Sequence, residues 1–308
     1  MPSRPPGCGA SHVSGDALLA AASRELRRGI ETSRRVGGGD INDAWALDLD
    51  DGTSAFLKSR PDAPADEYGA EAAGLEWLSA AGGLQVPEVL AVLDEPGARG
   101  LLLAWIEPGR LDRDGEEELG RGLALVHRAG AKAFDALPPR SPRSALRFGG
   151  VELPLGSVPA GSPWSAHYGT RLELLSRVAM ERGQIGVECA QLLTGVIERM
   201  DELAGPAEPP ARVHGDLWSG NVLAGAHGRP WMIDPAAHGA HRELDLAMLD
   251  LFGTVTRRTL AAYEEVEPLA QGHLDRRGLW QLQPLLVHAI LFGGSYGAAA
   301  ERVAGRYR

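Results

Sequence analysis

The chain contains 308 residues and carries a formal net charge of −10 at pH 7; 44% of its residues are hydrophobic and 23% are charged. This composition is ordinary for a globular protein, and the length suggests one large domain or two moderate ones. The acidic balance, without a stripe of lysine and arginine, argues against a nucleic-acid partner.

The N-terminal part predicts a small antiparallel-sheet lobe. Residues 1–14 are rich in Pro, Gly and Ser and are expected to form a disordered leader. Helical spacing of apolar residues covers 16–28, ends at Gly29, and returns from 64 to 81. Short strands are expected at 30–37, 43–49, 53–59, 88–93 and 101–106.

The remaining chain predicts a mostly helical lobe. We assign 15–106 to an N-terminal nucleotide-binding lobe and 107–308 to a C-terminal catalytic and substrate lobe, which together make an α+β fold. A segment rich in Pro, Gly and Ser over 138–163 indicates a functional loop or disorder. Helices are expected at 114–130, 163–182, 186–204, 243–252, 256–266 and 278–292.

No apolar run approaches the roughly 18 residues of a membrane span, so no membrane partner is expected. The apolar segment 17–22 is too short for a secretion signal. Cys8 and Cys189 lie in unrelated surroundings and suggest reduced thiols, with no disulfide framework. We therefore expect a cytoplasmic protein, and the sequence leaves its oligomeric state open.

Residues 214–221 (HGDLWSGN) and Asp234 indicate the chemistry. Asp216 and Asn221 follow the spacing Asp-x-x-x-x-Asn, and Asp234 ends an apolar strand. In phosphoryl transfer, one carboxylate accepts the proton of an attacking hydroxyl, while an amide oxygen and a second carboxylate hold magnesium against nucleotide phosphates. The pattern predicts a kinase fold with Asp216 as catalytic base. Alone, Asp216 would more often be a residue that caps a turn.

Asn221 and Asp234 are the candidate magnesium ligands, because hard oxygen donors suit this ion. Two strands joined by a turn at 225–228 would bring both residues to the same end of a hairpin. His214 could compete as the base, but a packed histidine that bonds the loop backbone is the favoured interpretation. The alternative for Asp234 is a plain strand-end residue before proline.

Lys58 ends an apolar strand and could reach nucleotide phosphates. Glu71 shares a helical face with Leu75 and Leu78, so it points inward and needs a cation. We therefore predict a Lys58–Glu71 ion pair. Glu67, one turn earlier, is the rival partner for Lys58, and a solvated strand-end lysine is the simpler alternative.

Two backbone segments could complete a nucleotide site. The glycine-rich segment 37–42 could cover phosphates, although a plain hairpin would look similar. Residues 103–106 could be a hinge that bonds the adenine edge, although a buried edge strand would look the same. The candidate residues in these segments are Gly37, Gly38, Gly39, Asn42, Ala104 and Ile106.

Three further candidate site residues lie in the second lobe. Asp245 begins a helix among apolar neighbours and is expected to bond backbone amides of the catalytic loop; an acid favoured by the helix dipole is the alternative. Trp218 could stack on a substrate sugar or simply pack in the interior. His288 is a further candidate on the substrate side.

In order along the chain, these motifs resemble the fructosamine-3-kinase or ketosamine-3-kinase family, which is related in fold to aminoglycoside phosphotransferases and protein kinases. The resemblance covers about 16 to 300. It is carried by the segments 214–221 (HGDLWSGN), 233–236 (IDPA), 242–247 (RELDLA) and 288–296 (HAILFGGSY), with weaker matches at 38–42, 56–58 and 71–75.

The resemblance implies a bilobal protein-kinase-like fold. It also implies ATP- and Mg²⁺-dependent phosphorylation of the sugar 3-hydroxyl of small-molecule or protein-linked ketosamines, a deglycation repair activity in which the adduct then decomposes and releases the amine. By position, Asp216 would be the base, Asn221 and Asp234 the metal ligands, and Lys58 with Glu71 the nucleotide anchor.

Three positions depart from the family pattern. Asp40 stands where many relatives carry cysteine, which argues against thiol-based control; His241 replaces an acid before Arg-Glu; Ala104 replaces a common hinge acid. The alternatives are a kinase of the same fold that acts on an aminoglycoside, a choline-like alcohol or another amino sugar, and a pseudokinase that only binds nucleotide. The sequence does not separate fructosamine from ribulosamine substrates.

Overall fold

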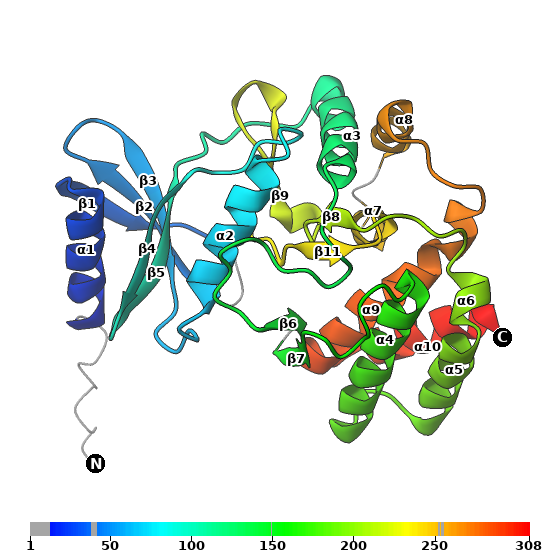
Figure 1. Ribbon diagram of the computed structural model, residues 1–308. Helices are drawn as coiled ribbons and strands as arrows, with labels where there is room; N and C mark the ends of the chain where they lie inside the picture. The colour runs from blue at the N-terminus through cyan, green and yellow to red at the C-terminus, as the bar shows by residue number, and fades with distance from the viewer. Residues whose placement is uncertain (1–12, 38–41, 149, 252, 254–255) are drawn as a thin grey trace, which may run out of the picture. The chain divides into compact units, whose positions relative to one another are not determined.

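The chain divides into two compact units, which are described separately: Met1–Ala72 with Pro87–Glu107, and Ala73–Val86 with Pro108–Arg308. The predicted α+β class is confirmed, because the first unit holds a small antiparallel sheet and the second is mostly helical (Figure 1). Most of the leader predicted over 1–14 lies outside the described residues. The computed structural model describes residues 13–37, 42–148, 150–251, 253 and 256–308.

Within the described part of the first unit, an antiparallel sheet of five strands has the order β1-β2-β3-β5-β4. Gly52 (φ 78°) and Gly97 (φ 82°) supply the left-handed backbone of its two tight turns. Helix α1 (Val13–Leu26) packs against the sheet, and its Leu18 and Ala22 are buried in a core shared with the strands. The strands are β1 (Ile30–Arg35), β2 (Asp43–Leu49), β3 (Ser54–Ser59), β4 (Val89–Glu95) and β5 (Ala98–Ala104).

Helix α2 (Glu67–Ser79) begins in the first unit and ends in the second. Its inward face contains Leu75 and Leu78, both fully buried, as the sequence predicts. In the second unit, Gly74 of α2 lies against the loop that follows strand β10 (Pro230–Met232): a Cβ at this position would meet the Pro235 side chain at 3.3 Å. The small residue therefore permits close packing of helix and loop.

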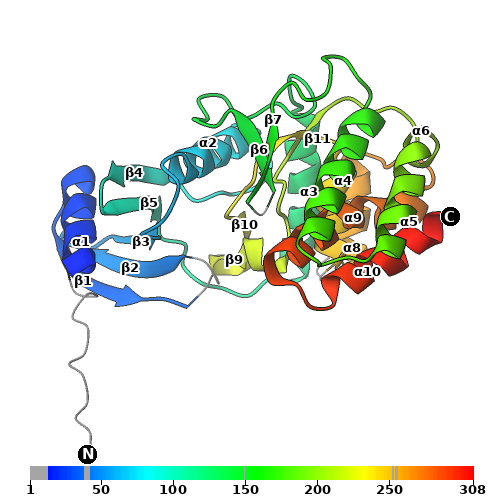
Figure 2. The same ribbon diagram turned by 90° about the horizontal axis from the view of Figure 1, so that it is seen from below.

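Helices α4, α5, α9 and α10 of the second unit pack around a core that contains Tyr168 and Trp280, while α3 packs against α8 (Figure 2). These contacts bury apolar faces that no single helix could cover. The helices of this unit are α3 (Arg113–Arg128), α4 (Trp164–Glu181), α5 (Val187–Glu198), α6 (Met200–Leu203), α7 (Glu243–Leu251), α8 (Arg257–Val266), α9 (His273–Phe292) and α10 (Tyr296–Ala304).

Short antiparallel ribbons position the loops of the second unit. One ribbon leads into residues 214–221, and another leads into residues 233–236, so both motifs begin where a strand ends. The pairs are β8 (Ala211–Val213) with β11 (His238–Ala240), β9 (Val222–Ala224) with β10 (Pro230–Met232), and β6 (Ala145–Phe148) with β7 (Val151–Pro154).

Several sequence predictions need correction. The segment 138–163, predicted as a loop, contains the β6–β7 hairpin, whose Leu146 and Leu153 are buried in the core. The helix predicted over 186–204 is interrupted at Arg199, where the backbone is non-helical (φ −102°, ψ 13°). Arg199 also donates to the carbonyl oxygen of Tyr307 (2.9 Å), so a tertiary contact accompanies the break.

Two further differences concern the C-terminal helices. Helix α9 begins at His273, before the predicted start at 278, and α10 was not predicted. The many Ala and Gly residues of α10 give a weak apolar pattern in the sequence, yet Ala300 and Ala304 are buried. Among the described residues, no helix has both the length and the apolar character needed to cross a bilayer.

Candidate active site

The first unit contains the predicted ion pair between Lys58 and Glu71. Lys58 Nζ lies 2.6 Å from Glu71 Oε2, and the two side chains are only 7% and 10% exposed. The rival Glu67 is instead paired with Arg60 at 2.9 Å. Lys58 lies on the central strand β3, opposite Ala44, so its ammonium group is held at a fixed place on the sheet. The pair places a cation and a carboxylate in contact where both are largely shielded from solvent.

The predicted glycine-rich segment is described only in part. Gly38 and Gly39 lie outside the described residues, as does Asp40, while Gly37 follows β1. Asn42 is fixed by Tyr68 of α2, whose hydroxyl donates to Asn42 Oδ1 at 3.0 Å. The side chain of Asn42 therefore ties the end of this segment to the helix that carries Glu71.

The predicted hinge begins on β5 and continues beyond it. Ala104 is the last residue of β5, pairs with Ala55 and donates its backbone N–H to the Glu88 carbonyl at 2.9 Å. Ile106 lies beyond the strand and is half-buried. The strand predicted over 101–106 thus ends earlier than expected.

In the second unit, residues 214–221 place Asp216 and Asn221 in direct contact. Asn221 Nδ2 donates to the backbone oxygen of Asp216 at 2.8 Å and to its Oδ2 at 3.2 Å. Both bonds use the nitrogen of the carboxamide, so its oxygen is the atom that could bind a cation. Burial raises the pKa of Asp216; the nearby Asp234 acts in the same direction, whereas His214 and His288 act against it.

Asp234 lies at the same end of the β9–β10 ribbon as Asn221, as the sequence predicts. Met232 pairs with Val222, and the N–H of Ile233 donates to the Asn221 carbonyl at 3.1 Å. Asp234 has a left-handed backbone (φ 54°), a conformation that is unfavourable for residues other than glycine but less so for Asp and Asn. Such strain is common where a side chain must be aimed at a ligand.

His214 has the structural role that the sequence favours. Its Nε2 lies 2.8 Å from the Ile233 carbonyl, and its Nδ1 accepts the backbone N–H of Asp216 at 3.3 Å. The imidazole is fully buried and links the two motif loops. A ring nitrogen that already accepts a bond from the Asp216 backbone is not available as a competing base.

Asp245 forms the predicted bonds to the catalytic loop. Its Oδ2 accepts the N–H of His214 at 2.7 Å, and its Oδ1 accepts the N–H of Gly215 at 2.9 Å. Burial alone would raise the pKa of Asp245, but His127, His214 and Gly215 reverse this effect and lower it. His127 was missed in the sequence, where it is an ordinary histidine near the end of an amphipathic helix.

The two substrate-side candidates differ in their surroundings. Trp218 is 38% exposed and its ring covers Gly220, where a Cβ would approach the ring to 2.4 Å. His288 lies on α9, bonds the Pro284 carbonyl through Nδ1 at 2.8 Å, and contacts the ring of Phe292 at a centroid distance of 5.6 Å. Phe292 is 54% exposed, so this aromatic surface is open to solvent.

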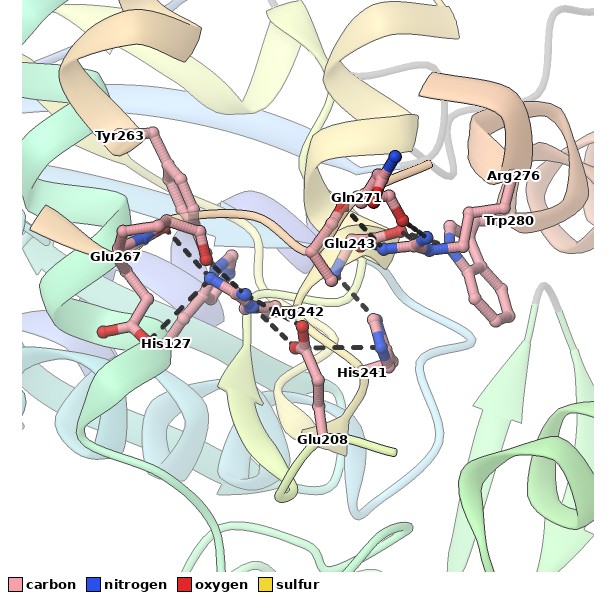
Figure 3. Close-up of polar contacts among 12 residues, drawn as sticks. His127, Glu208, His241, Arg242, Glu243, Tyr263, Glu267, Gln271, Arg276 and Trp280 are labelled. Atoms are coloured by element: carbon pink, nitrogen blue, oxygen red, sulfur yellow. Dashed lines mark hydrogen bonds and ion pairs between the residues drawn. The ribbon is translucent and has the colours of Figure 1, made fainter. Parts of the chain in front are cut away.

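A second group of potential metal ligands lies around the start of α7. Glu208, His241 and Glu243 bring ligand atoms within 4.8 Å of one another (Figure 3). Glu208 is already paired with Arg242 at 2.6 Å, and Glu243 with Arg276 at 2.8 Å. The guanidinium groups balance both carboxylates, so this cluster is an ion-pair network and is unfavourable for a divalent cation.

The residue types of Asp216, Asn221 and Asp234 suit one kind of chemistry. A buried carboxylate can accept the proton of a hydroxyl group, and an amide oxygen and a carboxylate at one hairpin end can hold a hard cation. Phosphoryl transfer to an alcohol uses groups of these kinds.

The fold is that of the kinase-like phosphotransferases. A macrolide 2'-phosphotransferase from Brachybacterium faecium superposes with a TM-score of 0.64 over 95% of this chain and 98% of its own, at 17% identity. A sequence model described as fructosamine kinase matches residues 17–307. The chain belongs to this family and is a phosphotransferase.

Closer relatives agree with this assignment. A probable ketoamine kinase of Synechocystis is 32% identical over 279 residues, which cover 89% of each chain. The crystal structure of a candidate fructosamine-3-kinase from Thermobifida fusca superposes with a TM-score of 0.84 and 36% identity, over 95% of this chain and 98% of its own.

Proposed function

We propose that the protein is an ATP- and Mg²⁺-dependent kinase that phosphorylates the sugar 3-hydroxyl of ketosamines, the fructosamine or ribulosamine adducts of amines. The observation that carries the proposal is the contact of Asp216 with Asn221, beside a strained Asp234, in a chain of the fructosamine kinase family. The reaction would begin deglycation, because phosphorylated adducts decompose and release the amine.

In this proposal the second unit performs the chemistry. Asp216 accepts the proton of the sugar hydroxyl and orients its oxygen towards the phosphorus atom, and Asn221 Nδ2 holds the carboxylate of Asp216. Asn221 Oδ1 and the carboxylate of Asp234 fit Mg²⁺, which usually takes one or two protein oxygens. When bound, Mg²⁺ offsets charge on the phosphates.

The first unit supplies the nucleotide anchor in this proposal. Lys58, oriented by Glu71, offers a point charge to phosphate oxygens, and the segments 37–42 and 104–106 offer backbone groups. Trp218 and His288 are proposed to contact the sugar and the amine of the substrate. Trp218 belongs to the loop of Asp216, His288 is near enough to act on the charge of Asp216, and the rings of Trp218 and Phe292 are exposed. An aromatic ring can cover the apolar face of a sugar.

The decisive experiment is phosphorus NMR of the products from ATP with fructoselysine, ribuloselysine, choline and an aminoglycoside. We expect a new phosphomonoester at the sugar 3-position with one or both ketosamines and none with the other alcohols. Phosphorylation of the aminoglycoside or choline alone would replace the ketosamine proposal by another acceptor class of the same fold. Tight Mg-ATP binding without turnover of any acceptor would indicate a pseudokinase.

Removal of the Lys58 charge should weaken nucleotide use. Because Lys58→Met alone would take from the buried Glu71 the cation that it contacts, we choose the double variant Lys58→Met with Glu71→Met, which replaces the pair by apolar side chains. The KM for ATP is expected to rise at least about tenfold through loss of a charge-assisted contact to phosphate. Initial rates over a range of ATP concentrations measure this change.

The matched control for this double variant is Arg60→Met with Glu67→Met. It removes the neighbouring ion pair between a strand-end cation and the same helix, at similar separation. Its KM for ATP should stay near the wild-type value. Equal effects in both double variants would show that Lys58 is only a structural charge.

A further inference from the structure

The first turn of α7 ties three parts of the second unit together. Arg242, just before the helix, donates to both carboxylate oxygens of Glu208 (2.6 and 2.8 Å) and to the backbone oxygens of Glu267 and Pro268 (3.1 and 2.8 Å), which follow α8 (Figure 3). Arg242 therefore fixes the end of α8 relative to α7.

The next two acids of this turn face different partners. Glu243 accepts from Arg276 and from Trp280 Nε1, both at 2.8 Å, and so holds α9. Asp245 accepts the backbone N–H groups of the catalytic loop. The spacing Arg-Glu-x-Asp thus connects α8, α9 and the catalytic loop through one helical turn.

The carboxylate of Asp245 also contacts a side chain, that of His127 on α3. The Nε2 atom of His127 lies 3.1 Å from Asp245 Oδ2, and its Nδ1 lies 2.8 Å from the hydroxyl oxygen of Tyr263 on α8. Asp245 and His127 are 1% and 2% exposed, and Tyr263 is fully buried, so water does not substitute for these bonds.

The hydrogen-bond chemistry selects one tautomer of His127. The carboxylate of Asp245 can only accept, so Nε2 must carry a proton. In a neutral imidazole, Nδ1 is then an acceptor and requires a donor. The Tyr263 hydroxyl is that donor. Burial raises the pKa of this hydroxyl, so it keeps its proton.

The position of Tyr263 is itself fixed. Its ring meets the His127 ring edge to face at a centroid distance of 5.6 Å, and the Arg242 guanidinium carbon lies 6.0 Å from its centroid. Arg242 also holds the carbonyl groups just beyond α8. The direction of the Tyr263 hydroxyl therefore depends on packing that α7 organises.

We propose that Tyr263 is a positioning residue for the phosphoryl transfer: its hydroxyl donates to Nδ1 of His127 in the Nε2–H tautomer that Asp245 requires, and so holds the ring that orients Asp245 and the loop that carries Asp216. This proposal rests on the proposed kinase function. The connection runs through four hydrogen bonds within the second unit and leaves nucleotide contacts untouched.

The test removes one hydroxyl group. In Tyr263→Phe the ring and its packing remain, but Nδ1 of His127 loses its donor. We expect kcat to fall about tenfold, as for a buried acceptor left unsatisfied, while the KM values for ATP and ketosamine stay within about twofold. The control Tyr168→Phe removes another fully buried hydroxyl, which bonds the Leu279 carbonyl at 2.8 Å, and should leave kcat unchanged.

Two measurements separate this role from general destabilisation. Long-range proton–nitrogen NMR should show the Nε2–H tautomer for His127 in the wild type, with Nδ1 as a hydrogen-bonded acceptor, and a changed Nδ1 chemical shift in Tyr263→Phe, where that bond is absent. In a His127→Gln background, whose amide can donate to Asp245 without help from a hydroxyl, adding Tyr263→Phe should change kcat by less than about twofold.

Three outcomes would overturn the proposal: an unchanged Nδ1 chemical shift of His127 in Tyr263→Phe, an equal loss of kcat in Tyr168→Phe, or a full Tyr263→Phe effect in the His127→Gln background. Absence of turnover by the wild-type protein with every ketosamine would instead defeat the kinase function. The NMR result would still decide whether the Tyr263 hydroxyl bonds Nδ1 of His127.

Discussion

Asp216→Asn is expected to lower kcat for the ketosamine by at least ~10²-fold, the range of general-base catalysis. The substitution keeps the shape of the side chain and the bond from Asn221 Nδ2 to the Asp216 backbone oxygen. It removes the group that accepts the hydroxyl proton. Since Asp216 is not proposed to bind the nucleotide, the dissociation constant for Mg-ATP should stay within about threefold. Steady-state kinetics and calorimetric titration measure the two quantities.

An exposed acid of the same unit provides the control. Asp201 lies on α6, is exposed, and should tolerate Asp201→Asn without change in kcat. If Asp216→Asn retained near-normal turnover, Asp216 would not be the base, and His214 would not replace it easily because its Nδ1 accepts the Asp216 backbone N–H.

Local patterns in the sequence were sufficient for the elements that depend on neighbouring residues. The turn at 50–52, with Gly52 in a left-handed conformation, predicts the β2–β3 hairpin. Helical spacing places Glu71 on the face of Leu75 and Leu78, and this face identifies its partner Lys58. In each case the prediction rests on the spacing of residues within a short segment.

Contacts between distant segments could not be predicted in this way. Strands β8 and β11 have three residues each, too few for a periodic pattern, and pair across a long separation in the sequence. His127 and Tyr263 are ordinary apolar-face residues of two helices until α3 packs against α8 and brings them to Asp245. Asp245 itself was predicted because its motif is local to α7.

In the candidate site, too, local patterns predict some features, whereas others depend on the packing of distant segments. The spacing within 214–221 identifies Asp216 and Asn221 as candidate residues of one site, and the apolar strands predict the hairpin that carries Asp234. The left-handed backbone of Asp234 has no local sequence signal, because Asp adopts it only under the constraint of surrounding packing. Such a conformation becomes evident only from the folded chain.

The left-handed backbone of Asp234 makes Asp234→Asn an informative variant. Asn adopts the left-handed region about as readily as Asp, so the backbone at this position (φ 54°) should be kept. The variant loses one negative charge at the proposed metal site. We expect kcat at a fixed Mg²⁺ concentration to fall at least ~10²-fold, since a bound metal contributes several kcal/mol to the transition state. The Mg²⁺ concentration for half-maximal rate should rise as well.

The Mg²⁺ titration of turnover separates this effect from loss of structure. His227→Asn is a matched control, because His227 lies on the same hairpin, is exposed, and has nearly the same backbone angle (φ 60°). It should leave both kcat and the Mg²⁺ requirement unchanged. Asp234→Ala would be less informative, because alanine in a left-handed conformation adds a cost of about 1–2 kcal/mol to folding. Wild-type turnover and Mg²⁺ dependence in Asp234→Asn would remove Asp234 from the metal site, and the proposed mechanism would lose its second oxygen ligand.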